Sequence, residues 1–345
     1  MSPLSGVEDP RLTPVLREDR VCTGVTSLRG RLFLSYPAAD RPGVQVVEVL
    51  PDGRRDPYPD RAWNRADRSP DSTFVHVNSL RAGPDGRLWI VDSGARQLGD
   101  RQVPGGARLI VVDLDADRVD RVYHLAEAVH PTSYLDDVRF NGPTAYLSDA
   151  GAPGLVVLDL DSGRSRRALD GHPSAVGGPL VADGRVVRDA TGAEVRLHMD
   201  QLEVSPDGRW LYYQPASGGM SRIGTRWLDD PSVPVEETAG RVEPWCDTPC
   251  TGGTAIDADG TIYLSDVERR RVLALASDGS VRTLVDDPRL VWVDAMWLDA
   301  DARLWLPAAQ LHLTAGLNGG QSAVDYPVWI YRMPVDVGPP ARDHS

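Results

Sequence analysis

Acidic and amide side chains recur at one position of a repeated sequence pattern. Each copy begins with a short apolar strand, continues through an Asp-Gly-type turn and ends in a second strand rich in Leu, Trp, Tyr and Val. Aligning the copies by their turns superposes one amide, three carboxylates and one glycine, namely Asn78, Asp136, Asp200, Asp294 and Gly252. Carboxylates that converge on one axis repel each other unless a cation lies among them, and Ca²⁺ prefers oxygen ligands. The pattern predicts a divalent metal, most simply Ca²⁺, held by Asn78, Asp136, Asp200 and Asp294.

These acidic residues also admit a purely structural interpretation. Asp136 and Asp200 would then cap strands or pair with arginines such as Arg139. The sequence leaves the two interpretations open.

Two histidines stand close to the same positions. His76 precedes Asn78 by two residues, and His198 precedes Asp200 by two. Residues two apart in an extended strand lie on the same side, so both imidazoles are expected near the acidic side chains. Because histidine titrates near neutral pH, the candidates for moving a proton are His76, His198, Asp200 and Asp294. The alternative is that each histidine is an ordinary loop or core residue.

Further side chains are candidates for binding a substrate. Gln310 and His312 follow an apolar strand and would alternate on one face of its continuation, which leads them toward the same site. Tyr134, Trp292 and Tyr326 are candidates for aromatic walls. The cysteines are three, and Cys246 and Cys250 are four apart, a spacing that fits neither a zinc knuckle nor a CxxC redox motif. We expect two ordinary thiols, with a disulfide as the alternative in an oxidising compartment.

Absent residues and motifs exclude several kinds of chemistry. The chain has no lysine, so all 37 of its basic side chains are arginine and a Schiff base with pyridoxal phosphate (PLP) cannot form. It has no GxSxG, no HExxH, and no glycine-rich phosphate or dinucleotide motif, so no nucleotide or flavin is expected. What remains is proton-transfer chemistry on a small molecule.

Charge and hydropathy limit the partners. The net charge of −13 argues against binding to nucleic acid or to an anionic membrane. No apolar run approaches the ~20 residues of a membrane span. The first residues lack the basic and apolar regions of a secretory signal, which favours a cytoplasmic location. The expected partner is a small-molecule substrate or ligand.

The repeats predict the architecture that positions these residues. Five units start at residues 78, 136, 200, 252 and 294, and a fainter copy starts at Val25. Successive starts are 42 to 64 residues apart, and a propeller blade needs roughly 40–50 residues. We predict an all-β, six-bladed β-propeller that occupies residues 1–345 as one domain. Residues 1–20 are expected to include a strand that closes the ring, residues 171–197 to form a hairpin over one face, and residues 335–345 to be a frayed tail.

Several units resemble those of the major royal jelly protein/yellow family. The resemblance rests on Tyr134-Leu-Asp-Asp-Val-Arg, on the segment from Ala145 to Leu160, on Asp85-Gly-Arg-Leu-Trp-Ile-Val-Asp-Ser-Gly and on Trp292-Val-Asp-Ala-Met-Trp. It runs from about Cys22 to Pro334 and implies a six-bladed propeller. For function it implies either a small-molecule enzyme, with dopachrome-type substrates in insect members, or a binder of amines, or a nutritive protein.

The acidic positions are also similar to those of gluconolactonase-type six-bladed propellers. That similarity implies a divalent metal held by Glu, Asn and Asp from the strand starts, and lactone hydrolysis. The sequence departs from it in two places, because the blade-one glutamate of those enzymes has no evident counterpart at Cys22-Thr23-Gly24 and an aspartate position falls on Gly252.

We therefore expect an enzyme whose site lies at the mouth of the propeller channel. The reaction would be metal-assisted hydrolysis of a lactone, or isomerisation, tautomerisation or cyclisation of a cyclic metabolite. A protein that binds an amine or aromatic ligand without turnover is the main alternative. A platform for protein interactions is a further one.

Overall fold

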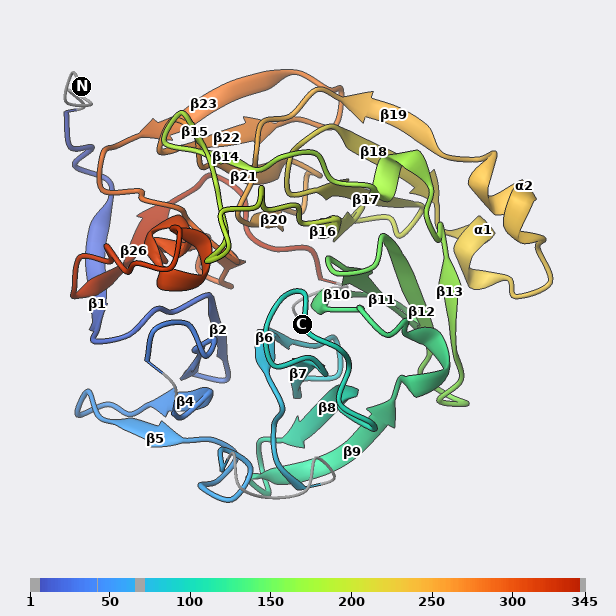
Figure 1. Cartoon of the computed structure of the whole chain (residues 1–345), viewed down its shortest axis with the longest axis horizontal. Coiled ribbons are helices and arrows are strands. Elements are labelled where there is room, and N and C mark those ends of the chain that lie inside the picture. Colours follow the sequence, from blue (N-terminus) through green and yellow to red (C-terminus); the bar gives the residue numbers. More distant parts are fainter. Residues whose placement is uncertain (1–6, 42, 66–71, 342–345) are drawn as a thin grey trace.

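Six four-stranded antiparallel sheets form a ring in the described residues, which are 7–41, 43–65 and 72–341 of a computed structural model (Figure 1). Each sheet is one blade, with its first strand nearest the axis and its last strand outermost, and blade 6 differs only in how it is completed. The predicted six-bladed β-propeller is confirmed.

The first three blades follow the chain in order. Blade 1 consists of β2 (Gly24–Leu28), β3 (Arg31–Ser35), β4 (Val46–Val49) and β5 (Arg55–Pro57). Blade 2 consists of β6 (Val77–Ala82), β7 (Leu88–Ser93), β8 (Ala107–Asp113) and β9 (Arg118–His124). Blade 3 consists of β10 (Leu135–Asn141), β11 (Thr144–Asp149), β12 (Gly154–Asp159) and β13 (Ser165–Ala168).

Blades 4 and 5 follow, and both α-helices of the described residues belong to blade 4. Blade 4 consists of β16 (Met199–Val204), β17 (Trp210–Pro215), β18 (Met220–Gly224) and β19 (Glu243–Cys246), with α1 (Arg226–Asp229) and α2 (Val235–Ala239) before β19. Blade 5 consists of β20 (Thr254–Ile256), β21 (Ile262–Asp266), β22 (Arg271–Leu275) and β23 (Val281–Asp286). Short 3₁₀ helices lie at Ala126–Ala128, Pro173–Ala175, Leu311–Leu313 and Ala315–Leu317.

The last blade joins the two ends of the chain. Blade 6 consists of β24 (Trp297–Leu298), β25 (Arg303–Pro307), β26 (Val328–Pro334) and β1 (Thr13–Glu18). Strand β1 pairs antiparallel with β26, so the first strand of the chain completes the final blade. Residues 335–341, expected to fray, instead make two backbone hydrogen bonds to the ring, from Val335 N to Ala302 O and from Ala258 N to Gly338 O. Residues 342–345 of the expected tail lie outside the described residues.

The core lies between neighbouring blades. The second strands β7 and β11 are buried along their whole length, because a blade packs against neighbours on both faces. Val91 and Leu109 of blade 2 share one apolar cluster with Val138 and Leu147 of blade 3. A single blade therefore leaves apolar surface exposed, and the ring is stable only as a whole.

The chain between blades 3 and 4 forms an insertion, defined as residues 171–197. It contains the expected hairpin, in which β14 (Val181–Ala182) pairs with β15 (Arg185–Val186) through the Asp183-Gly184 turn. Figure 1 shows β14 and β15 in front of blade 5. The helices within the described ranges are too short or too polar to cross a bilayer.

Candidate functional site

Three innermost strands are interrupted by β-bulges where they meet the channel. The ladder slips between Val77 and Ser79 in β6, between Leu135 and Val138 in β10, and between Met199 and Gln201 in β16. A bulge re-aims side chains and is frequent beside functional sites. Because of the bulges, consecutive residues of each strand reach the channel rather than alternate ones.

The re-aimed side chains enclose a cavity of about 10 Å³ on the propeller axis. It is lined by residues of five blades, namely Asn78, Ser79, Asp136, Asp137, Asp200, Gln201, Gly252, Gly253, Thr254, Asp294 and Ala295. The structure thus brings together all four residues predicted to bind a metal. A space of roughly 10–15 Å³ holds about one water molecule, so the cavity suits a single ion or water and no larger ligand.

Four of these side chains are carboxylates, and three of them, Asp136, Asp200 and Asp294, have no arginine partner among the described residues. Asp200 is buried, and Asp136 and Asp294 are partly buried. Burial is the largest cause that raises the pKa of Asp136 well above its ordinary value, and the charge of Asp200 and a hydrogen bond with it raise the pKa further. Burial and the charge of Asp294 likewise raise the pKa of Asp200. The pKa of Asp294 is raised by burial and by the charge of Asp136. Each carboxyl group thus favours a proton or a nearby cation over its free anion.

The hydrogen-bond donors around these carboxyl groups are neutral. The Asn78 amide donates to Asp136 Oδ1 at 2.6 Å, and the Gln201 amide donates to Asp200 Oδ2 at 2.9 Å. Asp294 accepts from the Trp292 indole at 3.1 Å and from the Ala295 backbone N–H at 2.8 Å. No ion pair to Asp136, Asp200 or Asp294 occurs among the described side chains.

Next to these carboxyl groups lies a second layer of charges, in which two carboxylates pair with two arginines. Asp137 binds both Arg81 at 2.5 Å and Arg139 at 2.7 Å, and Arg139 also binds Glu203 at 2.7 Å. Burial would raise the pKa of Asp137, but the two guanidinium groups outweigh burial and lower it. Arg139 therefore pairs with Asp137 and Glu203, and the alternative in which it neutralises Asp136 or Asp200 is not what the structure shows.

The donor set fits a hard divalent cation. Besides three carboxylates, the cavity is lined by the Ser79 hydroxyl and by Gln201 Oε1, and both oxygens are buried without a hydrogen-bond partner. Buried polar atoms are rarely left unpaired, and oxygen ligands of this kind are those that Ca²⁺ takes. In the described residues no group of three or more His, Cys, Asp or Glu side chains lies in a geometry that could hold a metal ion. Ligands would have to turn toward a cation, since Asp136 and Asp200 are hydrogen-bonded to each other.

Gly252 has a steric reason to be glycine. A Cβ atom on this residue would lie 2.4 Å from Val293 O, the backbone that leads into Asp294. Blade 6 therefore occupies the space that a fifth acidic side chain would need. No residue of blade 1 is among those that line the cavity. Glu18, at the end of β1, is buried and accepts from Tyr36 and pairs with Arg55 outside the cavity.

The two histidines expected near the site stand behind it. His76 is buried, and its Nε2 atom lies 2.9 Å from the Tyr134 hydroxyl oxygen. The same hydroxyl oxygen lies 3.0 Å from Asn78 Oδ1. Burial lowers the pKa of His76. His198 is half-buried, and its Nδ1 accepts from the Gly177 backbone N–H at 3.1 Å. Neither imidazole lines the cavity.

Three of the residues expected to bind substrate, Trp292, His312 and Gln310, contact other residues of the chain. The Trp292 ring stacks on His312 at 5.6 Å, and His312 contacts Asp183 at 3.1 Å. Gln310 was expected to alternate with His312 along a strand, but this expectation is wrong, because β25 ends at Pro307 and Leu311–Leu313 is a 3₁₀ helix. The Gln310 amide is occupied by two hydrogen bonds to the backbone of Asp325.

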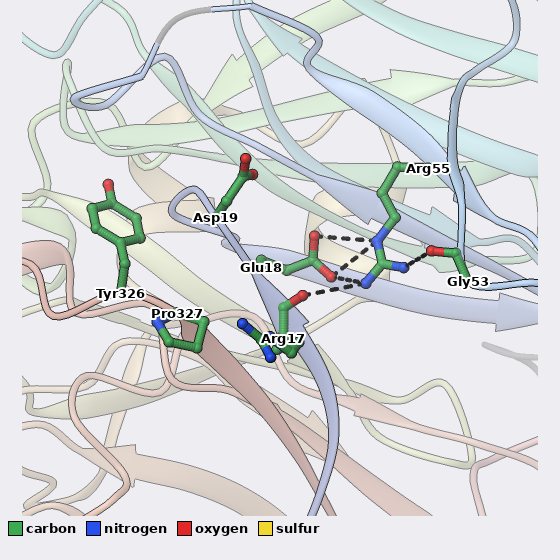
Figure 2. A pocket seen from close by; sticks show the side chains of 7 residues that line it. All are labelled: Arg17, Glu18, Asp19, Gly53, Arg55, Tyr326 and Pro327. Carbon is green, nitrogen blue, oxygen red and sulfur yellow. Dashed lines mark hydrogen bonds and ion pairs between the residues drawn. The ribbon is translucent and has the colours of Figure 1, made fainter.

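Tyr326 was expected at the channel mouth and lies elsewhere. It lines a separate open cleft of about 560 Å³ with Arg17, Glu18, Arg55 and Pro327, beside the outer strands of blades 1 and 6 (Figure 2). In this cleft Arg55 is bound to Glu18, and Tyr326 lies on the opposite side. The sequence pattern missed this displacement because Tyr326 follows a long connection after β25.

The insertion covers the mouth of the channel. Its side chains Leu180, Ala182 and Val187 form one apolar cluster with Cys250 and Trp292. Cys250 and Trp292 each precede a channel residue by two positions, so the insertion packs directly above the site. The Val181 backbone N–H also contacts Cys250 Sγ at 3.4 Å, and Cys246 and Cys250 are not bridged to each other.

Ser79 and Gln201 are the cavity residues that the sequence analysis missed. Each follows a predicted ligand directly, and strict alternation in a strand would turn it away from the channel. The pairs Asn78-Ser79, Asp136-Asp137 and Asp200-Gln201 at equivalent positions were the available signal.

Solved structures with this fold include several small-molecule proteins. The chain is similar to a gluconolactonase from Xanthomonas campestris, with 16% identity, a TM-score of 0.57, and coverage of 94% of this chain and 89% of that one. It is also similar to the calcium-binding protein regucalcin from Agrobacterium tumefaciens, with 12% identity, a TM-score of 0.55, and coverage of 95% and 92%. A virginiamycin B lyase from Staphylococcus aureus gives 12% identity, a TM-score of 0.55, and coverage of 94% and 99%. At these identities the likeness shows the fold.

Comparison by sequence gives the family. No curated protein matches the chain. The family model described as major royal jelly protein matches residues 77–336, which include the channel positions of blades 2 to 6. The match spans well over half of the chain, and the chain therefore belongs to the major royal jelly protein family.

Proposed function

We propose that the chain is an enzyme that acts on a small cyclic metabolite with a divalent cation, most simply Ca²⁺, at the channel site. The favoured reaction is hydrolysis of a lactone, with isomerisation, tautomerisation or cyclisation on the same site as close variants. One observation carries the proposal: three carboxyl groups with raised pKa values, and with no arginine partner in the described part of the chain, line a space of ionic size. The names of the similar structures, a gluconolactonase and a calcium-binding protein, support the same chemistry.

The chain's own residues supply ligands and a base. Asp136, Asp200 and Asp294 would hold the cation, with Asn78, Ser79 and Gln201 as further oxygen donors. A bound divalent cation polarises a substrate carbonyl and stabilises the negative charge that develops on its oxygen. Asp200 or Asp294 would accept the proton of the attacking water through a carboxylate oxygen that does not hold the cation. His76 does not line the cavity, and we give it no direct part in the proton transfer.

Substrate must reach the site past the insertion. A cavity of about 10 Å³ cannot admit a lactone ring, and Leu180, Ala182 and Val187 pack over the mouth. The proposed reaction therefore requires the insertion to move away from blade 5. The same cavity size favours a metal ion over an aromatic amine, which is the ligand of the non-catalytic alternative.

The test begins with the metal. Purified protein is subjected to elemental analysis before and after EDTA, and its melting temperature is followed while Ca²⁺, Mg²⁺, Mn²⁺ or Zn²⁺ is added. We expect one cation per chain, a lower melting temperature after chelation, and recovery with Ca²⁺. Lactones and tautomerisable cyclic ketones are then screened with that cation present.

Asp294→Asn is the matched variant for the activity screen, because it keeps the size and the acceptor oxygen of the side chain. We expect it to lose both the cation and the turnover. Turnover that survives chelation and this substitution would rule out the proposed mechanism. A metal-free protein that binds amines would instead favour the non-catalytic alternative.

A further inference from the structure

The hydroxyl group of Tyr134 faces two acceptors with one hydrogen. His76 Nδ1 lies 2.7 Å from Arg96 O, and a carbonyl oxygen only accepts, so Nδ1 carries the imidazole hydrogen. Nε2 of a neutral imidazole is then an acceptor, and it lies 2.9 Å from the Tyr134 hydroxyl. Asn78 Oδ1 is also an acceptor and lies 3.0 Å from the same hydroxyl. One of the two acceptors is left without a full hydrogen bond.

The orientation of Asn78 is the opposite of what a cation requires. Its Nδ2 atom donates to Asp136 Oδ1 at 2.6 Å and to Asp136 O at 3.1 Å, while its Oδ1 atom points to Tyr134. An amide nitrogen cannot ligate Ca²⁺, whereas the amide oxygen can. Asn78 is therefore set to donate to the carboxyl group and not to ligate an ion.

Turning the Asn78 amide over by about half a turn would satisfy both the Tyr134 hydroxyl group and His76 Nε2. Nδ2 would then donate to the Tyr134 oxygen, the Tyr134 hydrogen would go wholly to His76 Nε2, and Oδ1 would face Asp136 and the cavity. The distances among the three side chains already permit this arrangement, because oxygen and nitrogen exchange places without moving the amide plane. Its cost is the loss of the two hydrogen bonds from Nδ2 to Asp136 Oδ1 and Asp136 O. A cation held between Asn78 Oδ1 and the Asp136 carboxylate would offset that loss.

We propose that Tyr134, held by His76, is a positioning residue that selects which end of the Asn78 amide faces the cavity. The amide nitrogen faces inward without a cation, and the amide oxygen faces inward when one binds. This inference rests on the proposed cation site and adds to it two residues that do not touch the ion.

A double-mutant cycle of Tyr134→Phe and Asn78→Asp tests this role. Ca²⁺ affinity of the wild type, both single variants and the double variant is measured by titration calorimetry on the EDTA-treated full chain. Loss of an outer hydrogen-bond partner typically weakens metal binding 10–100-fold, so we expect Tyr134→Phe to weaken Ca²⁺ binding by about tenfold or more. Adding Tyr134→Phe to Asn78→Asp should change the affinity less than about twofold, because a carboxylate presents an oxygen in either orientation.

The outcomes separate this inference from the proposed function. Equal Ca²⁺ affinity in wild type and Tyr134→Phe overturns the positioning role alone. A loss that persists unchanged in the Asn78→Asp background also overturns it, since Tyr134 would then act only through packing. A wild-type chain that binds none of the four cations overturns both proposals. Melting curves of the metal-free variants show whether each is folded, and Phe keeps the ring that packs with Ala95 and Ala150.

Discussion

The Asp183 carboxylate binds the Arg270 guanidinium through two hydrogen bonds of 2.7 and 2.5 Å, and this pair fastens the insertion to blade 5. Asp183→Asn removes the charge but keeps the size of the side chain. A hydrogen bond to a charged group contributes about 1.5–3 kcal/mol, so amide exchange within the insertion should rise about tenfold or more. Hydrogen-exchange mass spectrometry of the segment that contains Leu180, Val187 and Val195 measures this.

Asp207→Asn is the control for Asp183→Asn, because Asp207 and Arg209 form an ion pair that is exposed. It should leave exchange in the insertion unchanged. Equal protection of the insertion in wild type and Asp183→Asn would show that apolar packing alone holds it closed.

Replacing Asp294 by Asn should separate metal binding from folding. The variant loses one of the three carboxylates around the cavity, and Asn keeps the acceptor for the Trp292 indole. Wild-type protein at a Ca²⁺ concentration of 100 times the dissociation constant gains about 2.7 kcal/mol in free energy of unfolding. We expect Asp294→Asn to gain nothing, as measured by urea unfolding with and without Ca²⁺. Asp229→Asn is the control: its pKa is also raised by burial, but it contacts Tyr146 and not the cavity, so it should respond to Ca²⁺ as the wild type does.

The stability of the metal-free chain should fall as the pH rises above about 4. The folded pKa values of Asp136, Asp200 and Asp294 lie above the unfolded value of about 3.9, so the folded state holds more protons than the unfolded state in this range. The contribution of these groups is present below about pH 4 and is lost as the pH rises toward the folded pKa values, at about 1.4 kcal/mol per pH unit for each proton. Urea unfolding in EDTA between about pH 5 and pH 7 measures the slope. A slope no steeper in wild type than in Asp294→Asn would contradict the raised pKa of Asp294.

Arg139→Met tests the balanced layer of charges. Arg139 is buried and binds both Asp137 and Glu203, so its removal leaves two buried carboxylates with less compensation. Breaking a buried pair costs about 3–5 kcal/mol, which should appear in the free energy of unfolding. Arg209→Met removes an exposed pair and should cost about 0–1 kcal/mol. Similar losses in the two variants would mean that the inner layer contributes no more than a surface pair.

Gly252→Ala should destabilise the ring at the join of blades 5 and 6. The added Cβ would lie 2.4 Å from Val293 O, and overpacking of this kind costs about 1–3 kcal/mol. Gly316→Ala is the control, because a Cβ there meets nothing within 4 Å. Equal melting temperatures for wild type and Gly252→Ala would show that the two blades separate easily, and that a fifth acidic side chain has room.

The repeated pattern was sufficient to predict the architecture and the convergence of Asn78, Asp136, Asp200 and Asp294. Both depend on periodic features, since the turn spacing gives the blade and the first strand of each blade starts at the axis. Ser79 and Gln201 could not be predicted, because their direction depends on β-bulges that break the alternation of strand side chains. The pairs of polar residues at equivalent positions were the available signal for these bulges, and strand alternation alone does not reveal them.

The positions of the residues predicted to bind substrate could not be foreseen in the same way, because most of these residues lie in connections between strands. Gln310 and Tyr326 lie in the long connection between β25 and β26. There Gln310 is held by Asp325 of the same connection, and Tyr326 lines the open cleft beside the outer strands of blades 1 and 6. The His312 side chain is directed by Trp292 and Asp183, which belong to blade 6 and the insertion. Strand periodicity carries no information about such partners.

The pairing of β1 with β26 also governs how the chain is made. Thr13–Glu18 is the first strand of the ring to be synthesised, and its partner Val328–Pro334 is the last. At a translation rate of about 5–20 residues per second, β1 waits for tens of seconds with its edge unpaired. During that interval the nascent chain presents an open sheet edge to any other strand, including β26 of a neighbouring chain on the same messenger. Closure of the ring therefore requires β1 to stay unpaired until β26 has been made.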